Sequence, residues 1–362
     1  MSSFLLFCVV LCAAVVVHAP APEGAPAASV SPRHSLGAAI DAVLTATSPR
    51  GFSGGVLVAR RDERLYERAA GLPGRSAPTL ASQYVIGSIS KQMTAALVLR
   101  AAAQNRVELD APLRTYLPDL TDEWADQVSI AQLLNHTSGI DTLGRPLLHR
   151  AGSVFAYSNF SYLLLGRLLE RVRGQPFALQ AEEMFAHCGM KDSLMPPQSE
   201  SLRTLPRLMP GLVERGDGRL WPWSAQRNVA HNPSGGAVST LGDLVRWNAC
   251  LHQGKWISGP FYQAMITPAA TAQRSHRWGK LGYGYGLQVS EHDGLLELSH
   301  SGYVEGYLST LLYYPVQQLS VVVLEHVSWL DSPPERTFAV HDRVRSLVRE
   351  SLRAGTVVAA RT

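Results

Sequence analysis

Lysine is scarce in this sequence. It occurs at four of 362 positions, so arginine carries almost all of the positive charge. The arginines are scattered without a long basic run, and the net charge is only +4. Because nucleic-acid binding needs a clustered basic face, this pattern argues against a nucleic-acid partner. Charged residues make up 17% of the chain and hydrophobic residues 46%, which is typical of a folded globular protein and excludes a disordered one.

The N-terminus carries one uninterrupted apolar run, Phe4–Val17. A membrane-spanning helix needs about 20 apolar residues, so this shorter run fits the hydrophobic region of a secretory signal better. We therefore expect a signal peptide within residues 1–27, a linker over 28–34, and a periplasmic or secreted protein. No basic residue precedes the run, and Pro20 follows one candidate cleavage site. The cleavage point therefore stays open, and an uncleaved membrane anchor is the alternative.

Cysteine is also rare, with four in the chain. Cys8 and Cys12 lie in the expected signal, which leaves Cys188 and Cys250. An oxidising compartment permits these two to pair, but two separate buried thiols fit the sequence equally well. The twelve histidines show no metal-ligand spacing, and Gly282–Gly286 is not followed by the helix that a dinucleotide loop requires. We expect no metal and no other cofactor.

Hydrophobic periodicity predicts strands near both ends of the chain and helices between them. The expected helices cover about residues 35–46, 91–104, 130–135, 160–173, 176–187, 241–252 and 336–353, and the expected strands 51–61, 64–71, 285–290, 295–299, 308–314 and 319–326. This order predicts an α/β (α+β) fold, in which a mixed or antiparallel sheet is flanked by helices. The expected domain spans residues 35–355 with a helical insertion at about 105–235, and a cleft is expected at their junction.

Ser88 and Lys91 are the first candidate catalytic pair. They lie three residues apart at the start of a predicted helix, about one turn, so their side chains share a face. A serine hydroxyl is a weak nucleophile that needs an adjacent base. Burial and the positive end of a helix dipole both favour the uncharged lysine amine, which then accepts a proton. The alternative is a helix-capping serine followed by an exposed lysine.

Two further segments carry chemistry-bearing residues. Tyr157 stands beside Asn159 just before a predicted helix, and its phenolate would serve as a base if Lys91 were charged. Asn159 offers an amide that holds a substrate carbonyl or orients Lys91. His300, Ser301 and Gly302 follow a predicted strand, where a glycine lets a substrate backbone approach closely. Taken singly, the tyrosine fits a core aromatic and His300 a polar residue at a strand end.

The ordered set Ser88-x-x-Lys91, Tyr157-x-Asn159 and His300-Ser301-Gly302 resembles the serine β-lactamase and D,D-peptidase superfamily, also called penicillin-binding protein-like. The Tyr-x-Asn form is that of class C β-lactamases, D,D-carboxypeptidases and related esterases. Segments 84–92, 133–140 and 235–243 also look like this family, and the similarity runs from about residue 35 to 352. The resemblance implies a β-lactamase/transpeptidase-like fold.

The resemblance also implies a role for each motif residue. Ser88 becomes acylated, Lys91 and Tyr157 move its proton, backbone N–H groups of Ser88 and Tyr303 bind the oxyanion, and Asn159, His300, Ser301 and Gly302 line the substrate. Which of Lys91 and Tyr157 is the base stays open.

Many β-lactamases have lysine where this chain has His300, and a neutral histidine provides less charge for a substrate carboxylate. We therefore expect a serine hydrolase that acts through an acyl-enzyme on an ester, amide or D-amino-acid peptide bond rather than efficiently on penicillin. The alternative is a module that binds penicillin or peptidoglycan without turnover. The expected partner is a small-molecule or peptide substrate. Proximity to a membrane or cell wall and the oligomeric state stay open.

Overall fold

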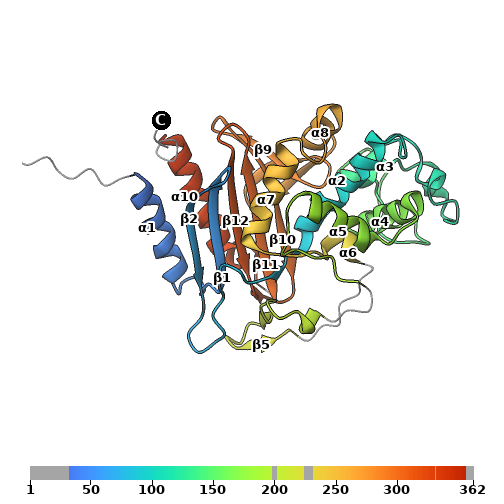
Figure 1. Ribbon diagram of the computed structural model, residues 1–362. Coiled ribbons are helices and arrows are strands. Elements are labelled where there is room, and N and C mark those ends of the chain that lie inside the picture. Colours follow the sequence, from blue (N-terminus) through green and yellow to red (C-terminus); the bar gives the residue numbers. More distant parts are fainter. Residues whose placement is uncertain (1–31, 198–201, 224–230, 331, 356–362) are drawn as a thin grey trace, which may run out of the picture. The chain divides into compact units, whose positions relative to one another are not determined.

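The computed structural model describes residues 32–197, 202–223, 231–330 and 332–355 (Figure 1). The expected signal peptide at 1–27 therefore lies outside the described residues, as do Cys8 and Cys12. Residues from Pro32 onward belong to one compact unit. Among the described residues, no helix is both long and apolar enough to cross a membrane.

An antiparallel sheet of eight strands forms the centre of this unit (Figure 1). In spatial order its strands are β2 (Glu63–Ala70), β1 (Gly54–Arg60), β12 (Leu319–Glu325), β11 (Tyr307–Tyr314), β10 (Leu295–Val304), β9 (Gln288–His292), β8 (Gly279–Tyr283) and β7 (Gln273–His276). Strands from near the two ends of the chain therefore pair directly, with Val56 opposite Val323 in the β1–β12 ladder. This confirms the expected sheet built from both ends of the sequence.

The two faces of the sheet are buried under different helices. Val56 and Val58 of β1 pack in a cluster with residues of α1 (Pro32–Thr45) and α10 (Ala339–Arg353). Leu57 belongs to the larger core on the opposite face. Successive residues of a strand point to opposite faces, so a continuously apolar strand such as β1 indicates a sheet covered on both sides.

The larger core on the opposite face is built with a second group of helices. They are α2 (Ser90–Ala103), α3 (Ile130–Leu134), α4 (Asn159–Arg173), α5 (Phe177–His187), α6 (Asn232–Gly235), α7 (Leu241–His252) and α8 (Gly259–Ile266). α4 begins where the Ser158 side chain accepts a hydrogen bond from the Ser161 N–H, and it ends at the left-handed Gly174. α7 begins after Thr240, whose side chain accepts a hydrogen bond from the Asp243 N–H.

Several elements differ from the sequence prediction. The hairpin β7–β8 was missed because its strands are short and polar and therefore lack the β-branched alternation that marks a strand. The strand expected at 285–290 begins only at Gln288, because Gly286, at a φ of 76°, turns the chain before it.

Other departures concern short elements. The predicted helical middle also holds β4 (Leu212–Glu214) and β5 (Leu220–Pro222), which form a small sheet with β13 (Val327–Trp329). β6 (Val238–Ser239) was not predicted either, and it pairs with β3 (Tyr84–Val85), whose own sequence is strand-like. The last predicted helix is divided into α9 (Pro334–Thr337) and α10.

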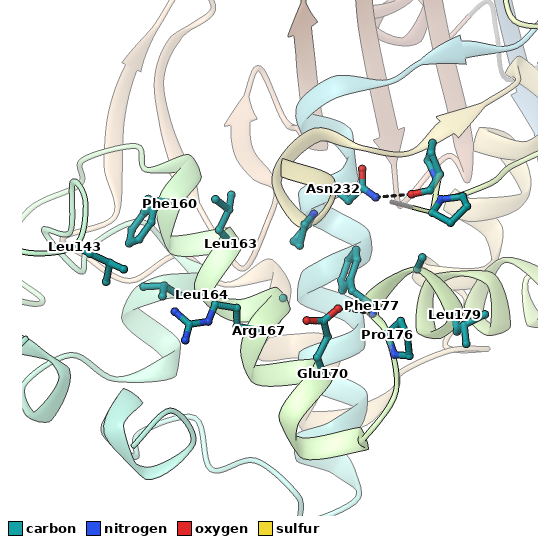
Figure 2. Close-up of a pocket in the computed structure, with 15 residues that line it drawn as sticks. Leu143, Phe160, Leu163, Leu164, Arg167, Glu170, Pro176, Phe177, Leu179 and Asn232 are labelled. Atoms are coloured by element: carbon teal, nitrogen blue, oxygen red, sulfur yellow. Dashed lines mark hydrogen bonds between the residues drawn. The ribbon is translucent and has the colours of Figure 1, made fainter. Parts of the chain in front are cut away.

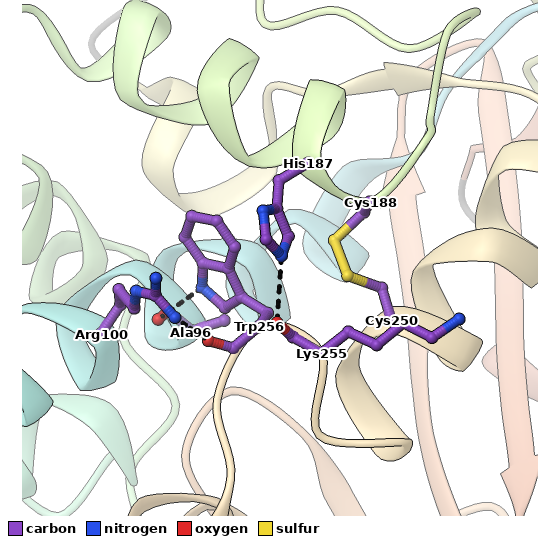
Figure 3. The surroundings of a disulfide bond; sticks show 7 residues. All are labelled: Ala96, Arg100, His187, Cys188, Cys250, Lys255 and Trp256. Carbon is purple, nitrogen blue, oxygen red and sulfur yellow. Dashed lines mark hydrogen bonds between the residues drawn. A yellow bond between two sulfur atoms is a disulfide. The ribbon is translucent and has the colours of Figure 1, made fainter.

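Cys188 and Cys250 form a disulfide, with their Cα atoms 5.4 Å apart (Figure 3). Of the two alternatives that the sequence left open, the structure thus has the bonded pair. The bond joins the end of α5 to α7, which itself packs on β1 and β12. Beside it, His187 Nε2 lies 3.0 Å from the Lys255 carbonyl oxygen. The disulfide therefore ties the helical region to the layer that covers the sheet.

Candidate active site

The turn that carries Ser88 is fixed by close backbone packing. It is a short 3₁₀ helix, η1 (Gly87–Ile89), that leads directly into α2. A Cβ atom built on Gly87 would lie only 3.1 Å from the Tyr303 backbone nitrogen, and the φ of Gly87 is 53°. The Ser90 hydroxyl donates to the Gly87 carbonyl at 2.7 Å and accepts from the Ala237 N–H at 3.0 Å. Glycine is required here, and Ser88 is held against β10.

Lys91 is fully buried and its amine has three polar neighbours. Nζ lies 3.1 Å from Ser88 Oγ, 2.7 Å from Asn159 Oδ1 and 2.6 Å from the Ser234 carbonyl oxygen. No described carboxylate forms an ion pair with it. Burial therefore lowers the pKa of Lys91 well below its ordinary value, which favours the uncharged amine.

This set of neighbours suits an uncharged amine. Two of them, the Asn159 amide oxygen and the Ser234 carbonyl oxygen, can only accept hydrogen bonds, so they take both N–H groups of the neutral amine. The lone pair is then left for the third neighbour, the Ser88 hydroxyl, which can donate. The geometry thus allows Lys91 to receive the serine proton.

Tyr157 lines the same pocket as Ser88, and its ring centroid lies 4.9 Å from Lys91 Nζ. Burial raises the pKa of Tyr157 to about 12, although the nearby Ser88 side chain and the charge of Arg274 act in the opposite direction. In the free protein Tyr157 is therefore a neutral phenol. The phenolate that the sequence suggested as a base is disfavoured.

His136 supports the segment before α4. Its Nδ1 accepts a hydrogen bond from the Ser158 N–H at 3.2 Å. Its ring centroid lies 4.3 Å from that of Tyr157. Burial and the nearby Lys91 hold the pKa of His136 well below its ordinary value, so the ring is neutral. It therefore positions Tyr157 without adding charge.

His300 is neutral and both of its ring nitrogens are occupied. Nδ1 lies 2.7 Å from the Ser301 carbonyl oxygen, and Nε2 lies 2.8 Å from the Tyr283 hydroxyl. Since the carbonyl only accepts, Nδ1 carries the proton and Nε2 accepts from Tyr283. Burial lowers the pKa of His300 to about 3. His300 thus lines the pocket that contains Ser88 but provides no positive charge there at neutral pH.

Position 302 requires glycine because other atoms of the protein lie very close to it, which the sequence did not reveal. A Cβ atom at this position would lie 2.2 Å from the Ile86 carbonyl oxygen and 2.3 Å from Ser309 Oγ. The close approach is therefore to the protein's own backbone. One edge of β10 is nevertheless open beyond Ser299, because β10 pairs with β9 only up to that residue, while residues 300–304 pair with β11 alone.

Six of the predicted site residues line one pocket of about 280 Å³. They are Ser88, Tyr157, Asn159, His300, Ser301 and Tyr303; Lys91 lies buried behind Ser88, and Gly302 packs against Ile86. Arg274, His276, Arg277, Gln288 and Phe338 complete the lining, and no sequence motif indicated them. Among the described lining residues two are arginines and none is acidic. The pocket therefore combines the candidate nucleophile and candidate proton carriers with two arginine side chains.

A second pocket, of about 710 Å³, lies between α4 and α5 and is mainly apolar (Figure 2). Its charged residues already have partners: Glu170 accepts from the Phe177 N–H at 2.9 Å, and Arg167 pairs with Asp119 at 2.7 Å. None of the predicted site residues lines it. The candidate catalytic residues therefore lie at the smaller pocket.

Comparison with known proteins agrees with this geometry. The family model described as Beta-lactamase matches residues 40–340. The chain is 28% identical over 298 residues to the D-alanyl-D-alanine-carboxypeptidase/endopeptidase AmpH of Escherichia coli K12, across 73% of this chain and 71% of that protein. It is 34% identical over 203 residues to esterase EstB of Burkholderia gladioli, across 44% of this chain and 51% of the esterase.

A D-stereospecific amidohydrolase from Streptomyces sp. has a similar structure. The TM-score is 0.73 at 21% identity, and the match covers 86% of this chain and 97% of the other. At this identity the likeness concerns the fold alone, and it confirms the fold that the sequence motifs implied.

Proposed function

Because the chain belongs to the β-lactamase family and is a serine hydrolase, we propose that it cleaves an ester, amide or D-amino-acid peptide bond through an acyl-enzyme on Ser88. The observation that carries this proposal is the environment of the Lys91 amine, which has two acceptor-only neighbours and the Ser88 hydroxyl as its third. A serine nucleophile needs such a base within hydrogen-bond reach.

In the proposed mechanism, Lys91 takes the proton of Ser88 while Oγ attacks the substrate carbonyl carbon. The oxyanion faces backbone N–H groups of Ser88 and Tyr303, since the turn and β10 approach each other closely at Gly87. Tyr157 then donates its proton to the leaving group and regains one from the protonated Lys91. Water releases the acyl group by the reverse proton path, so the enzyme ends in its starting state.

The relatives support acyl transfer without fixing the substrate. Their names describe a D-alanyl-D-alanine carboxypeptidase/endopeptidase, an esterase and, among solved structures, a D-stereospecific amidohydrolase. All three reactions break a bond at an acyl carbon, which the proposed mechanism serves equally. The bond that this chain prefers is decided by the pocket wall rather than by the fold.

An activity panel tests the proposal. Wild-type protein is offered a p-nitrophenyl ester, a chromogenic cephalosporin and a D-Ala-D-Ala peptide, beside the variants Ser88→Ala and Ser90→Ala. We expect turnover of at least one substrate by wild type and none by Ser88→Ala. Ser90→Ala is the matched control, because Ser90 is a buried structural hydroxyl in the same turn. Turnover that survives Ser88→Ala would refute the proposal. A single stoichiometric burst would instead favour the module that binds without turnover.

Export is part of the same proposal. It is supported by the apolar run Phe4–Val17 and by the disulfide between Cys188 and Cys250, which suits an oxidising compartment. The intact mass of the chain recovered from the extracytoplasmic fraction is expected to lack an N-terminal segment. Recovery of the full-length chain from the cytoplasm, with reduced cysteines, would contradict export.

A further inference from the structure

One arginine of the active-site pocket has no acidic partner. Arg274 lies on the edge strand β7, and no described residue forms an ion pair or hydrogen bond with its guanidinium. Its Nε is enclosed and has no hydrogen-bond partner. Enclosed charged groups normally form hydrogen bonds with all of their donors. The Nε–H of Arg274 therefore lacks an acceptor that a bound ligand would supply.

The guanidinium of Arg274 is placed by aromatic rings. Its central carbon lies 5.6 Å from the ring centroid of Phe155 and 5.7 Å from that of Tyr157. Contacts of this kind hold a cation over a ring face and leave its edge donors free to bind another group. Arg274, Tyr157 and Ser88 line the same pocket, so the cation lies close to the candidate nucleophile.

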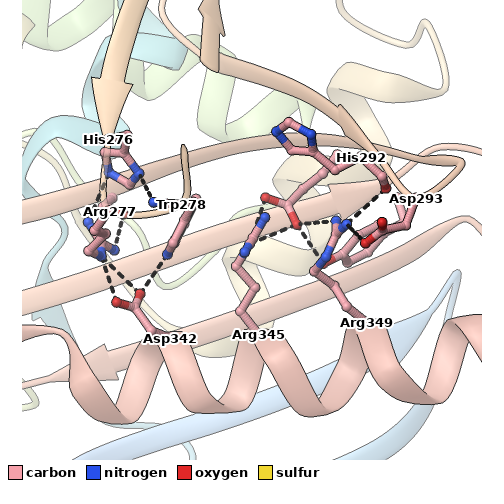
Figure 4. Close-up of polar contacts among 11 residues, drawn as sticks. His276, Arg277, Trp278, His292, Asp293, Asp342, Arg345 and Arg349 are labelled. Atoms are coloured by element: carbon pink, nitrogen blue, oxygen red, sulfur yellow. Dashed lines mark hydrogen bonds and ion pairs between the residues drawn. The ribbon is translucent and has the colours of Figure 1, made fainter. Parts of the chain in front are cut away.

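The neighbouring Arg277, in contrast, has an acidic partner for its charge (Figure 4). Its Nε lies 2.9 Å from both carboxylate oxygens of Asp342, and its Nη2 donates to Ser301 Oγ at 3.0 Å. Arg345 and Arg349 are paired in the same way with Glu297 (Figure 4). Arg277 thus positions Ser301 with its charge balanced, whereas the charge of Arg274 is not balanced by any described carboxylate.

We propose that Arg274 is a specificity-determining residue that binds a carboxylate on the leaving-group side of the substrate. This rests on the proposed function. The carboxylate is assigned to the leaving group because Arg274 lies over Tyr157, which donates the proton to that group. A guanidinium binds a carboxylate through two parallel hydrogen bonds, and the unbalanced positive charge of Arg274 attracts anions to the pocket.

This assignment changes the substrate expected from the sequence. The neutral His300 of β10 argued against a substrate carboxylate. The positive charge is instead that of Arg274, which belongs to none of the motifs and lies on β7, a strand that the sequence did not predict. Among the bonds in the proposed range, the preferred substrate is then a peptide or depsipeptide with a free carboxylate next to the scissile bond, rather than a neutral ester.

A pair of thioesters isolates this effect. Benzoylglycyl thioglycolate carries a carboxylate on its leaving group, and its thioglycolamide counterpart carries a neutral amide. Both give the same acyl-enzyme, so deacylation cancels in the comparison. We expect wild type to prefer the carboxylate, and Arg274→Gln to lose about 10- to 100-fold in kcat/KM for it, since hydrogen bonds to a charged group are worth that much. Arg274→Gln should leave the amide within about threefold of wild type.

Controls separate this proposal from the proposed function. Arg274→Lys should keep part of the preference, because it retains the charge but not the fork of donors. Arg171→Gln removes an exposed arginine of α4 and should leave the ratio unchanged. Loss of both thioesters in Ser88→Ala reports on the proposed function alone. An unchanged ratio in Arg274→Gln, or a wild-type preference for the amide, would overturn the role of Arg274.

Binding gives a second readout that needs no turnover. Titration calorimetry of benzoylglycyl thioglycolate into Ser88→Ala, with and without Arg274→Gln, should show a dissociation constant at least about tenfold higher in the double variant. Added salt should weaken the binding of the Ser88→Ala protein more than that of the double variant. Equal dissociation constants would refute the inference even if neither thioester is hydrolysed.

Discussion

Replacing Tyr157 by phenylalanine should separate two classes of substrate. With a pKa of about 12, the phenol of Tyr157 lies about five pH units from ionisation at neutrality, so roughly one molecule in 10⁵ carries the phenolate. Lys91, by contrast, is shifted toward its uncharged form and contacts Ser88 Oγ at 3.1 Å. In the proposed mechanism Lys91 is therefore the base, and Tyr157 is the acid that protonates the leaving group.

The size of the effect follows from this division. General acid catalysis contributes about 10²- to 10⁴-fold to a proton-requiring step. A p-nitroanilide leaves as an amine and needs the proton, whereas a p-nitrophenyl ester leaves as a stable anion and does not. Tyr157→Phe should therefore slow acylation by the anilide about 10²- to 10⁴-fold and by the ester of the same acyl group less than about tenfold. Lys91→Met should slow both by similar factors.

Pre-steady-state measurement of released nitroaniline or nitrophenol gives the acylation rates directly. Phenylalanine retains the ring that packs 4.3 Å from His136, so circular dichroism and thermal unfolding should show that Tyr157→Phe is folded. Equal losses on the ester and the anilide in Tyr157→Phe would refute the reasoning, because they would mean that Tyr157 takes the serine proton.

Three predictions concern stability. Cys250→Ala opens a cross-link between residues 62 positions apart and should lower the free energy of unfolding by up to about 4 kcal/mol in urea denaturation, so an unchanged midpoint would show that the bond is absent. Glu325→Gln leaves the buried charge of Arg50, 2.6 Å away, unpaired and should cost about 3 kcal/mol. Burial raises the pKa of Glu325, but Arg50 and His341 together outweigh burial, so the pKa in the folded protein lies below the ordinary 4.5. The stabilisation by the ionised Glu325 is therefore fully present above pH 4.5 and is lost as the pH falls through the folded pKa. An acid-unfolding midpoint that is the same in wild type and Glu325→Gln would contradict it. Gly302→Ala forces its Cβ against the Ile86 carbonyl oxygen and should cost about 2 kcal/mol and reduce kcat/KM, and a fully stable, active variant would refute the close contact.

The sequence predicted those parts of the fold that local patterns determine. The apolar strands β1, β11 and β12 and the amphipathic or apolar helices α2, α4 and α7 carry their periodicity in consecutive residues. The hairpin β7–β8 does not, because its residues are largely polar and it is held in place by pairing with β9. The residues that it contributes to the pocket were therefore missed with it.

The candidate site, like the fold, was predicted only where local motifs mark its residues. Ser88, Lys91, Tyr157 and Asn159 were predicted because each lies in a short motif, and the structure brings them together. The Ser234 carbonyl oxygen was missed, since any residue type supplies a carbonyl. Arg274 and Arg277 were missed because only the order of strands in the sheet carries them to the pocket. No local pattern distinguishes an unpaired arginine from the many paired ones.

Mass spectrometry of the acylated protein tests the central claim most directly. Wild-type protein is mixed with a substrate of the thioester or p-nitrophenyl ester type, quenched in acid within the first turnover, and digested. The proposed mechanism predicts one acyl group, located by fragmentation on Ser88 and not on Ser90 two residues away, and none in Lys91→Met over the same interval. An adduct on another residue, or turnover without any adduct, would contradict it.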